Sequence, residues 1–319
     1  MGRRDVLQHL ASGRWVSGED IASLLGVSRA AVWKQIRALK RRGYRIEAAP
    51  GRGYRLAEGS DLLDAESILL DLKTEWLGHD LRCLQEATST NELAVSAARG
   101  CRDGTVFLAE IQTQGKGRLS RPWSSPPGGV WMSLVLKPAI PLSQAYRINM
   151  AVSVAVSRAI EHLYGLEAGI KWPNDILIAG RKVCGILMEV SAELDRLEYA
   201  VVGVGLNANI DASSLPEEWM ATSLQDEIGG RVSRVELIRE ILLETERACG
   251  RIEGDEIPEE WRRRSVTLGR RVRVASIWGT LEGEALDLAE DGALLLEADG
   301  VKRRVLAGDC IHLRAKEER

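Results

Sequence analysis

The stretch IKWPNDILIAGRKVCGILMEV, residues 170–190, consists of two apolar runs joined by a short polar connection. Runs of this length, rich in Ile, Leu and Val, predict two neighbouring strands. Lys171, Asn174 and Asp175 lie between the runs, and Lys182 lies at the start of the second. Polar groups beside a core cost free energy unless they are paired or used. We therefore take these four residues as site candidates, with an Asp175–Lys182 ion pair of purely structural role as the alternative.

The composition is that of a globular chain with several domains. Of 319 residues, 45% are hydrophobic and 28% are charged, which is enough for a substantial core. No apolar run has the length of a membrane span, and the basic start lacks the apolar core of a signal peptide. These features predict a cytoplasmic protein that does not associate with membranes.

The cysteines and histidines exclude several kinds of site. The five cysteines are far apart and form no CxxC pair, and the four histidines are scattered. This pattern argues against a disulfide framework, a zinc site and a histidine-based catalytic triad.

The net charge of −3 conceals an uneven distribution. Residues 1–60 contain 12 Lys and Arg against 5 Asp and Glu, so that this part carries +7 and the remainder −10. A basic module joined to an acidic body favours binding of a nucleic acid by the first part.

The basic part has the pattern of a winged helix-turn-helix. A helix that begins after Ser17 and ends at Gly26 precedes a second, basic helix that begins near Ser28 and ends at Gly43. Residues 44–56 then alternate around a Pro-Gly turn, which predicts a two-stranded wing. The alternative is a small helical domain with a solvated basic face. The predicted DNA contacts are Ser28, Arg29, Lys34, Arg37 and Arg52, and a dimer would read a two-fold operator.

Strands and helices interleave from residue 61 onward, which predicts a mixed α/β domain. The loop 112–129, QTQGKGRLSRPWSSPPGG, combines glycines with basic side chains. Backbone amides that a ligand can approach closely, together with cations, are suited to binding phosphate or carboxylate. The spacing matches neither a Walker loop nor a Rossmann fingerprint, and a mobile surface loop remains the alternative.

Several other polar and aromatic residues have structural interpretations of equal weight. Ser89 precedes Glu92 at capping-box spacing, and Asn207 could hydrogen-bond a turn. Gly203 and Gly205 could mark a strand bulge. Trp123 and Trp131 could belong to the core.

Taken together, the motifs resemble those of biotin–protein ligases. STN at 89–91, QTQGKGRLSRPW at 112–123, KWPND at 171–175, RKVCGILME at 181–189 and GVGLN at 203–207 occur in the order seen in that family. The winged helix in front resembles the bifunctional type, in which the ligase is also the biotin operon repressor. The resemblance covers nearly the whole chain.

The resemblance implies roles for individual residues. Catalytic roles fall to Arg118, Lys182 and Lys171, and a Mg²⁺ contact to Asp175. Nucleotide contacts fall to Arg118, Arg121, Trp123, Asn174 and Asn207. Biotin contacts fall to Ser89, Thr90, Asn91, Gln112, Gly115, Lys116, Gly117, Arg118, Lys182, Gly185 and Leu187.

Two positions depart from the family's Gly-Arg-Gly-Arg-x-Gly-Arg loop. Lys116 replaces an Arg, which keeps the charge and loses the planar fork. Ser120 replaces a Gly, which restricts the backbone. Both changes bear on how the loop orders and leave the expected reaction class unchanged.

The implied activity is the ATP- and Mg²⁺-dependent conversion of biotin to biotinoyl-5'-AMP. Biotin is then transferred to a lysine of a biotin carboxyl carrier protein. The resemblance also implies binding of operator DNA by a homodimer that forms when the adenylate is bound. Two alternatives remain: a ligand-sensing repressor without ligase activity, and a lipoate–protein ligase.

The last part of the chain, residues 268–314, alternates in short strands with two Asp-Gly turns. This pattern predicts a small SH3-like β barrel that helps to bind ATP or the acceptor, or that acts only as a structural cap. The predicted fold is thus α+β multidomain. Its parts are a winged helix-turn-helix (1–60), a mixed α/β catalytic domain of the biotin/lipoate ligase type (61–264) and the barrel (265–319).

Overall fold

The computed structural model describes residues 3–10, 13–41, 43–57, 61–276 and 279–313. The chain divides into two compact units. The first comprises Met1–Lys73 and Ser233–Arg239, and the second Thr74–Val232 and Glu240–Arg319. This division does not separate the central and C-terminal parts, so the three predicted domain spans stay a prediction.

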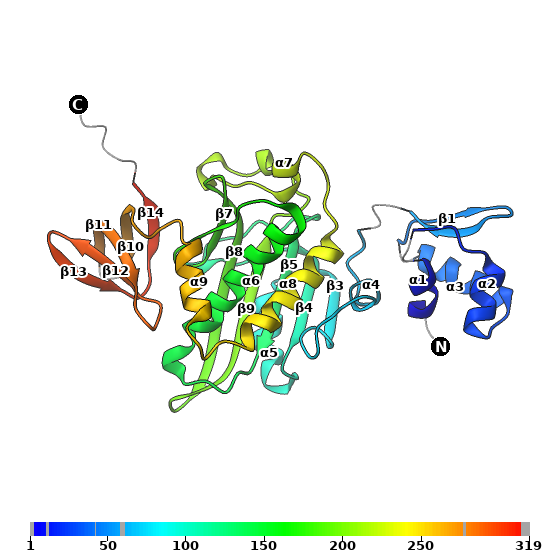
Figure 1. Ribbon diagram of the computed structural model, residues 1–319, viewed down its shortest axis with the longest axis horizontal. Coiled ribbons are helices and arrows are strands. Elements are labelled where there is room, and N and C mark those ends of the chain that lie inside the picture. Colours follow the sequence, from blue (N-terminus) through cyan, green and yellow to red (C-terminus); the bar gives the residue numbers. More distant parts are fainter. Residues whose placement is uncertain (1–2, 11–12, 42, 58–60, 277–278, 314–319) are drawn as a thin grey trace. The chain divides into compact units, whose positions relative to one another are not determined.

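The first unit is the expected winged helix-turn-helix. Ser17 precedes the second helix and accepts a hydrogen bond from the Asp20 amide at 3.0 Å, and Gly26 ends that helix at φ 65°. The left-handed backbone at Gly26 is the usual end of a helix. The elements are α1 (Arg3–Leu10), α2 (Gly18–Leu25), α3 (Arg29–Arg41), β1 (Ile46–Ala49), β2 (Gly53–Leu56) and α4 (Ala65–Leu69) (Figure 1).

The core of this unit lies on one face of α3. Val32, Ile36 and Leu39 are at most 2% exposed and pack with apolar residues of α1 and α2. Val16 pairs with Tyr54 through two backbone hydrogen bonds of 2.8 and 2.9 Å, which fixes the wing to the loop before α2. The opposite face of α3 therefore remains available to solvent or to a ligand.

The second unit is built on a seven-stranded mixed sheet of order β3-β4-β5-β9-β8-β7-β6. β3 and β4 are parallel and all other neighbours are antiparallel. The strands are β3 (Leu81–Ala87), β4 (Thr105–Gln112), β5 (Val130–Leu136), β6 (Gly169–Lys171), β7 (Asp175–Ile178), β8 (Arg181–Glu193) and β9 (Arg196–Leu206).

Helices cover this sheet. α5 (Thr90–Ala97) packs through Ala94 on Phe107, Val135 and Val201. Figure 1 shows α6 and α9 lying across one face of the sheet. The other helices of this unit are α6 (Tyr146–Tyr164), α7 (Leu224–Ile228), α9 (Glu256–Arg264) and the part of α8 (Arg234–Cys249) that follows Arg239.

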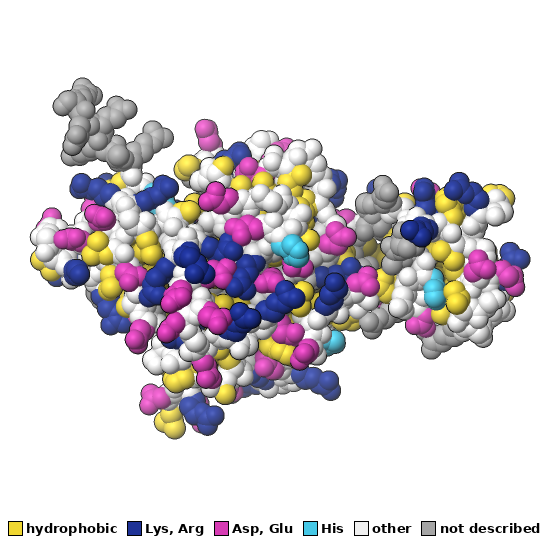
Figure 2. All heavy atoms as spheres, in the orientation of Figure 1, with side chains coloured by type: hydrophobic (Ala, Val, Ile, Leu, Met, Phe, Trp, Pro, Cys, Tyr) yellow, Lys and Arg dark blue, Asp and Glu magenta, His cyan; other side chains and the backbone are white. Residues whose placement is uncertain are grey.

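Ion pairs join α6 to α9. Arg158 pairs with Glu260, and Arg264 pairs with Glu161 at 2.6 Å. Figure 2 shows positive and negative side chains interspersed over this face of the unit. The two helices are thus held by charge pairs at their edges as well as by the apolar residues beneath them.

The C-terminal strands form a five-stranded antiparallel sheet of order β13-β12-β11-β10-β14. Gly292 and Gly300 have φ values of 80° and 74° at the two predicted Asp-Gly turns, a backbone that glycine adopts at little cost. The strands are β10 (Arg271–Ser276), β11 (Gly279–Leu288), β12 (Leu294–Ala298), β13 (Val301–Val305) and β14 (Asp309–His312).

The helices of the described ranges are all too short or too polar to cross a membrane.

Candidate active site

The candidate site is built on a row of residues that pair with one another across neighbouring strands of the central sheet. Lys171 pairs with Asp175, Asp175 with Gly185, and Gly185 with Gly205. Directly paired residues in antiparallel strands point to the same face. The pairing therefore brings two of the four opening candidates, Lys171 and Asp175, to one face above two glycines.

A bulge brings Lys182 to that same face. The pairing of β7 with β8 shifts between Ile176 and Leu177, so that Val183 is the extra residue and Lys182 lies opposite Leu177. Without this extra residue the alternation of the strand would turn Lys182 to the other face. The sequence also offered a possible bulge at Gly203 and Gly205, and that interpretation is wrong because β8 and β9 pair there without interruption.

Lys182 and Asp175 form an ion pair. The Lys182 Nζ lies 2.7 Å from Asp175 Oδ1, and the two side chains are 28% and 21% exposed. The Nζ also lies 5.0 Å from the centre of the Trp123 ring, within range of a cation–π interaction. The ion pair that we considered as a structural alternative therefore forms, and it lies within the candidate site.

The Trp123 indole lies on the two glycines of the row. A Cβ at Gly205 would lie 2.6 Å from Trp123 Nε1, and one at Gly185 would lie 3.1 Å from the ring. Only residues without a side chain allow this approach. Trp123 Nε1 is buried and has no hydrogen-bond partner in the described part of the chain. An acceptor atom of a ligand would satisfy this donor.

A network of polar side chains surrounds Gln112. The Gln112 Oε1 accepts from the Thr90 amide at 2.8 Å and from the Thr90 hydroxyl at 3.1 Å. The Gln112 Nε2 donates to Ser125 Oγ at 2.8 Å, and Ser133 Oγ donates to Thr90 Oγ1 at 2.8 Å. The predicted biotin contacts Thr90 and Gln112 are thus brought together. Ser125 and Ser133, which the sequence did not indicate, complete the network.

The STN motif at the start of α5 adjoins this network. Ser89 accepts from the Glu92 amide at 3.5 Å, in agreement with its structural interpretation as a cap. Asn91 accepts from Ser133 Oγ at 3.0 Å and donates to Glu189 at 2.6 Å. A ureido or amide ring could exchange hydrogen bonds with this set of amides and hydroxyls.

The loop 112–129 folds back on itself. Trp123 donates through its amide to the Gly115 carbonyl at 2.8 Å, and Gly117 donates to the Arg121 carbonyl at 2.8 Å. Leu119 and Ser120 have φ values of 55° and 57°. Ser120 therefore adopts a left-handed backbone at the position where the family pattern has glycine.

The basic side chains of the loop contact groups elsewhere in the unit. Lys116 pairs with Glu92 of α5. Arg118 Nη1 donates to the Gly308 carbonyl at 3.2 Å, and Arg121 pairs with Asp309 of β14. Burial lowers the pKa of the Arg118 guanidinium, while Tyr146, Asp309 and Asp175 oppose this shift.

The KWPND turn is held from two sides. Tyr146 of α6 donates through its hydroxyl to the Pro173 carbonyl at 2.8 Å, and Trp172 Nε1 donates to the Gly292 carbonyl at 3.0 Å. The side-chain amides of Asn174 and Asn207 donate to the carbonyls of Ile186 and Thr222. The nucleotide contacts predicted for these two asparagines stay predictions.

The Mg²⁺ contact predicted at Asp175 stays a prediction. The described residues contain no group of three or more acidic, histidine or cysteine side chains placed to bind a metal. Mg²⁺ is commonly held by one or two carboxylates together with the phosphates of a nucleotide. A single carboxylate beside cationic groups fits an ion that arrives bound to ATP.

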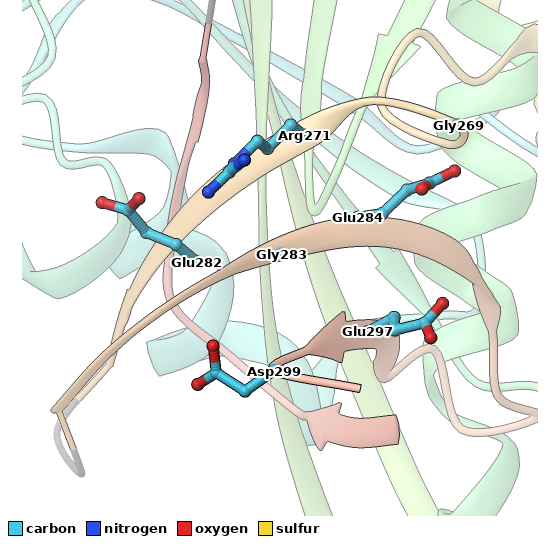
Figure 3. A pocket seen from close by; sticks show the side chains of 7 residues that line it. All are labelled: Gly269, Arg271, Glu282, Gly283, Glu284, Glu297 and Asp299. Atoms are coloured by element: carbon cyan, nitrogen blue, oxygen red, sulfur yellow. The ribbon is translucent and has the colours of Figure 1, made fainter. Parts of the chain in front are cut away.

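A hollow of about 450 Å³ lies on the C-terminal sheet instead. Figure 3 shows its carboxylates pointing in different directions from β11, β12 and the turn after β12. A surface of this charge repels phosphate and carboxylate ligands, so we do not place the active site there. The residues that line it are Gly269, Arg271, Glu282, Gly283, Glu284, Glu297 and Asp299.

Comparison with protein families gives three consecutive matches. Residues 82–207 match the Biotin/lipoate A/B protein ligase family. Residues 3–55 match an HTH domain, and residues 267–313 match the Biotin protein ligase C terminal domain.

Similar proteins extend over nearly the whole chain. The Bifunctional ligase/repressor BirA of Bacillus subtilis is 38% identical over 311 residues, which are 94% of this chain and 96% of the relative. The protein of the same description from Escherichia coli is 29% identical, over 97% of this chain and 96% of the relative. The structure of the biotin protein ligase of Aquifex aeolicus in complex with biotin and ATP covers 74% of this chain and 100% of its own. Its TM-score is 0.63 and its identity 27%.

Proposed function

The chain belongs to the family of the bifunctional ligase/repressor BirA proteins, and from this membership we propose the details of its own reaction. It is a biotin ligase with a helix-turn-helix repressor domain. We propose that it joins biotin to AMP and then transfers biotin to a lysine of a biotin carboxyl carrier protein. The observation that carries the proposal is the convergence of Lys171, Asp175, Lys182 and Trp123 on one face of the sheet.

The first step forms the acyl-adenylate. A carboxylate oxygen of biotin attacks the α-phosphorus of ATP in line, and pyrophosphate leaves. Such a step depends on positioning and on neutralising charge more than on a protein nucleophile. Lys182 and Arg118 supply positive charge to the phosphoryl oxygens, and Lys171 helps to position the nucleotide. Asp175 would hold the Mg²⁺ that accompanies ATP, and the ion would supply positive charge beside the phosphates.

The second step transfers biotin. The lysine amine of the acceptor attacks the carbonyl carbon of the mixed anhydride, and AMP leaves with the bonding electrons. The residues around Thr90 and Gln112 hold the ureido ring. The loop 112–129 covers the anhydride and excludes water. The predicted biotin contacts at Gly185 and Leu187 line the floor of the site.

The first unit binds operator DNA, in our proposal as part of a homodimer that forms when the adenylate is bound. Its support is the basic charge of residues 1–60, the exposed Lys34 and Arg37 on α3, and the exposed Arg52 in the wing turn. These side chains are suited to phosphate and base-edge contacts.

One assay tests the ligase proposal against its alternatives. The full-length protein is incubated with ATP, Mg²⁺ and either biotin or lipoate, and pyrophosphate release is measured. Label transfer to a biotin carboxyl carrier domain is followed in the same reactions. We expect pyrophosphate release and label transfer in the reactions that contain biotin, and neither in those that contain lipoate. Release without transfer would remove the proposed acceptor, and release with lipoate alone would assign the other acid.

A further inference from the structure

The basic helix α3 exposes one large apolar side chain among its basic residues. Trp33 is 51% exposed, although Val32 beside it is 1% exposed and belongs to the core. Ala30, Lys34 and Arg37 share the exposed side of the helix with Trp33. An isolated exposed apolar residue needs no explanation, but Trp33 lies among basic side chains.

Arg37 stacks on Trp33. The guanidinium carbon lies 4.6 Å from the centre of the indole ring. The two residues are one helical turn apart, at the i, i+4 spacing that brings side chains together. Stacking fixes the plane of the guanidinium. Arg37 therefore loses less conformational entropy when it binds a ligand.

The two DNA contacts predicted at the start of α3 are already engaged. The Ser28 hydroxyl accepts from the Ala31 amide at 3.2 Å and so caps the helix. Arg29 lies 3.3 Å from Glu19 in an ion pair. Base reading by this helix therefore depends more on Trp33 and Arg37 than the sequence alone indicated.

The wing contains a second arrangement of the same kind. Arg52 and Arg55 lie 4.6 and 5.0 Å from the centre of the Trp15 ring, and Arg55 also pairs with Glu47. Trp15 thereby positions the exposed Arg52 in the wing turn, which suits a phosphate contact that carries no sequence information. The pair on α3 is the one placed to read bases.

We propose that Trp33 and Arg37 together determine the sequence specificity of this unit. The edge of the Trp33 indole contacts the 5-methyl group of a thymine in the major groove. Arg37, held on the indole, donates to O6 and N7 of a neighbouring guanine. Both contacts follow from the groups that these bases present in the major groove. The inference rests on the proposed DNA-binding function and adds the residues and bases that confer specificity.

The test uses a duplex selected from a randomised DNA pool by the full-length protein in the presence of biotin, ATP and Mg²⁺. In that duplex each thymine is replaced in turn by deoxyuridine, and each guanine by 7-deazaguanine. We expect one thymine at which loss of the methyl group weakens wild-type binding by about fourfold. At one neighbouring guanine the loss is roughly tenfold or more.

The variants connect each base to its side chain. Trp33→Ala binds more weakly and no longer distinguishes thymine from deoxyuridine at the sensitive position. Arg37→Ala loses the discrimination at the guanine. Lys34→Ala is the matched control, which weakens binding to all duplexes and leaves both discriminations intact. Unchanged amide hydrogen exchange in α1, α2 and α3 shows that the first unit of each variant is folded.

Two results would overturn the proposal. The first is a Trp33→Ala protein that keeps the full deoxyuridine penalty at every thymine. The second is a Trp33→Ala protein with unchanged base preferences and weaker self-association in sedimentation, because the residue would then contact a second copy of the chain. Failure to select any duplex would reject the DNA-binding function itself, and is therefore distinguishable from failure of the inference.

Discussion

At the scale of single residues, the position of Lys182 depends on one inserted neighbour. Val183 is the extra residue of a bulge, is fully buried, and turns Lys182 to the face that carries Asp175. Their ion pair is only partly buried, which keeps its contribution to stability small. Nearby phosphate could therefore compete with Asp175 for the ammonium group.

We expect Lys182→Ala to slow adenylate formation about a hundredfold, since removal of one preorganised donor has this effect in comparable sites. Pyrophosphate release under single-turnover conditions measures the step. Lys182→Arg, which keeps the charge, should retain more activity than Lys182→Ala. Lys302→Ala, an exposed lysine of β13, serves as the control. A normal rate for Lys182→Ala would remove this residue from the reaction.

At the scale of elements, β14 contains a histidine whose protonation opposes folding. His312 Nε2 lies 3.0 Å from Thr267 Oγ1. Burial, followed by the positive charges of Lys171 and Arg270, lowers the pKa of His312 from 6.5 to about 4. The unfolded chain therefore binds a proton between these pH values and the folded chain does not.

The stability due to neutral His312 is complete above pH 6.5 and falls as the pH decreases toward 4. Between pH 7.5 and pH 5 the expected loss is about 2 kcal/mol. Urea unfolding at the two pH values measures it, and His312→Gln should reduce the loss by this amount. His162→Gln, at a site 72% exposed, should leave the loss in place. Equal acid sensitivity of wild type and His312→Gln would contradict the assignment.

The loop 112–129 and the start of β14 form a second contact between elements. Arg121 pairs with Asp309, and Arg118 donates to Gly308. We expect Asp309→Asn to speed tryptic cleavage after Lys116 and Arg118 by about two- to fivefold, because a partly exposed pair contributes at most about 1 kcal/mol. Asp299→Asn, a carboxylate outside this contact, is the control. Identical cleavage rates would indicate that the pair does not restrain the loop.

The strands and helices were largely predictable because their signals are local. Alternating apolar residues, the caps at Ser17 and Ser89, and the Asp-Gly turns depend on a few neighbouring residues. The bulge at Val183 was not predictable, since it depends on which strand pairs with β8. The contact of Arg118 with Gly308 joins residues 190 positions apart, and no local pattern encodes it.

The residues of the candidate site likewise include some that the sequence predicts and some that it does not. Gln112 and Thr90 were predictable from the motifs that resemble those of biotin–protein ligases, and the structure brings them together. Ser133 was not predictable because it lies within an apolar strand and donates to Thr90 from a fully buried position. The role of Trp33 was not predictable either, because a helical pattern alone does not reveal that a tryptophan points to solvent.

At the scale of the whole molecule, two arginines attach the segment after the wing to the start of α8. Arg234 donates to Asp61 through its amide at 3.0 Å, through Nε at 2.5 Å, and through Nη2 to the Asp61 carbonyl at 2.9 Å. The two side chains are 5% and 11% exposed. Arg239 donates to the carbonyls of Ser67 and Ile68. The first unit thus contains one segment that precedes the strands of the central sheet in the sequence and one that follows them.

We expect Arg234→Ala to destabilise the first unit by about 3–5 kcal/mol, because it leaves the buried Asp61 carboxylate without this partner. Binding to the selected duplex should then weaken, while pyrophosphate release should stay within about twofold of wild type, since neither residue of the pair lies among the candidate active-site residues. Both are measured on one preparation, with Arg251→Ala, an exposed arginine of the second unit, as the control.

The double variant Arg234→Ala with Asp61→Asn separates charge from packing. Replacing the Asp61 carboxylate by an amide should recover part of the lost DNA affinity if the cost is electrostatic, because a neutral amide is easier to bury than an ion. Parallel losses of DNA binding and pyrophosphate release in Arg234→Ala would contradict the expectation. They would mean that the first turns of α8 support the catalytic sheet, and that the two activities share this anchor instead of residing in separate units.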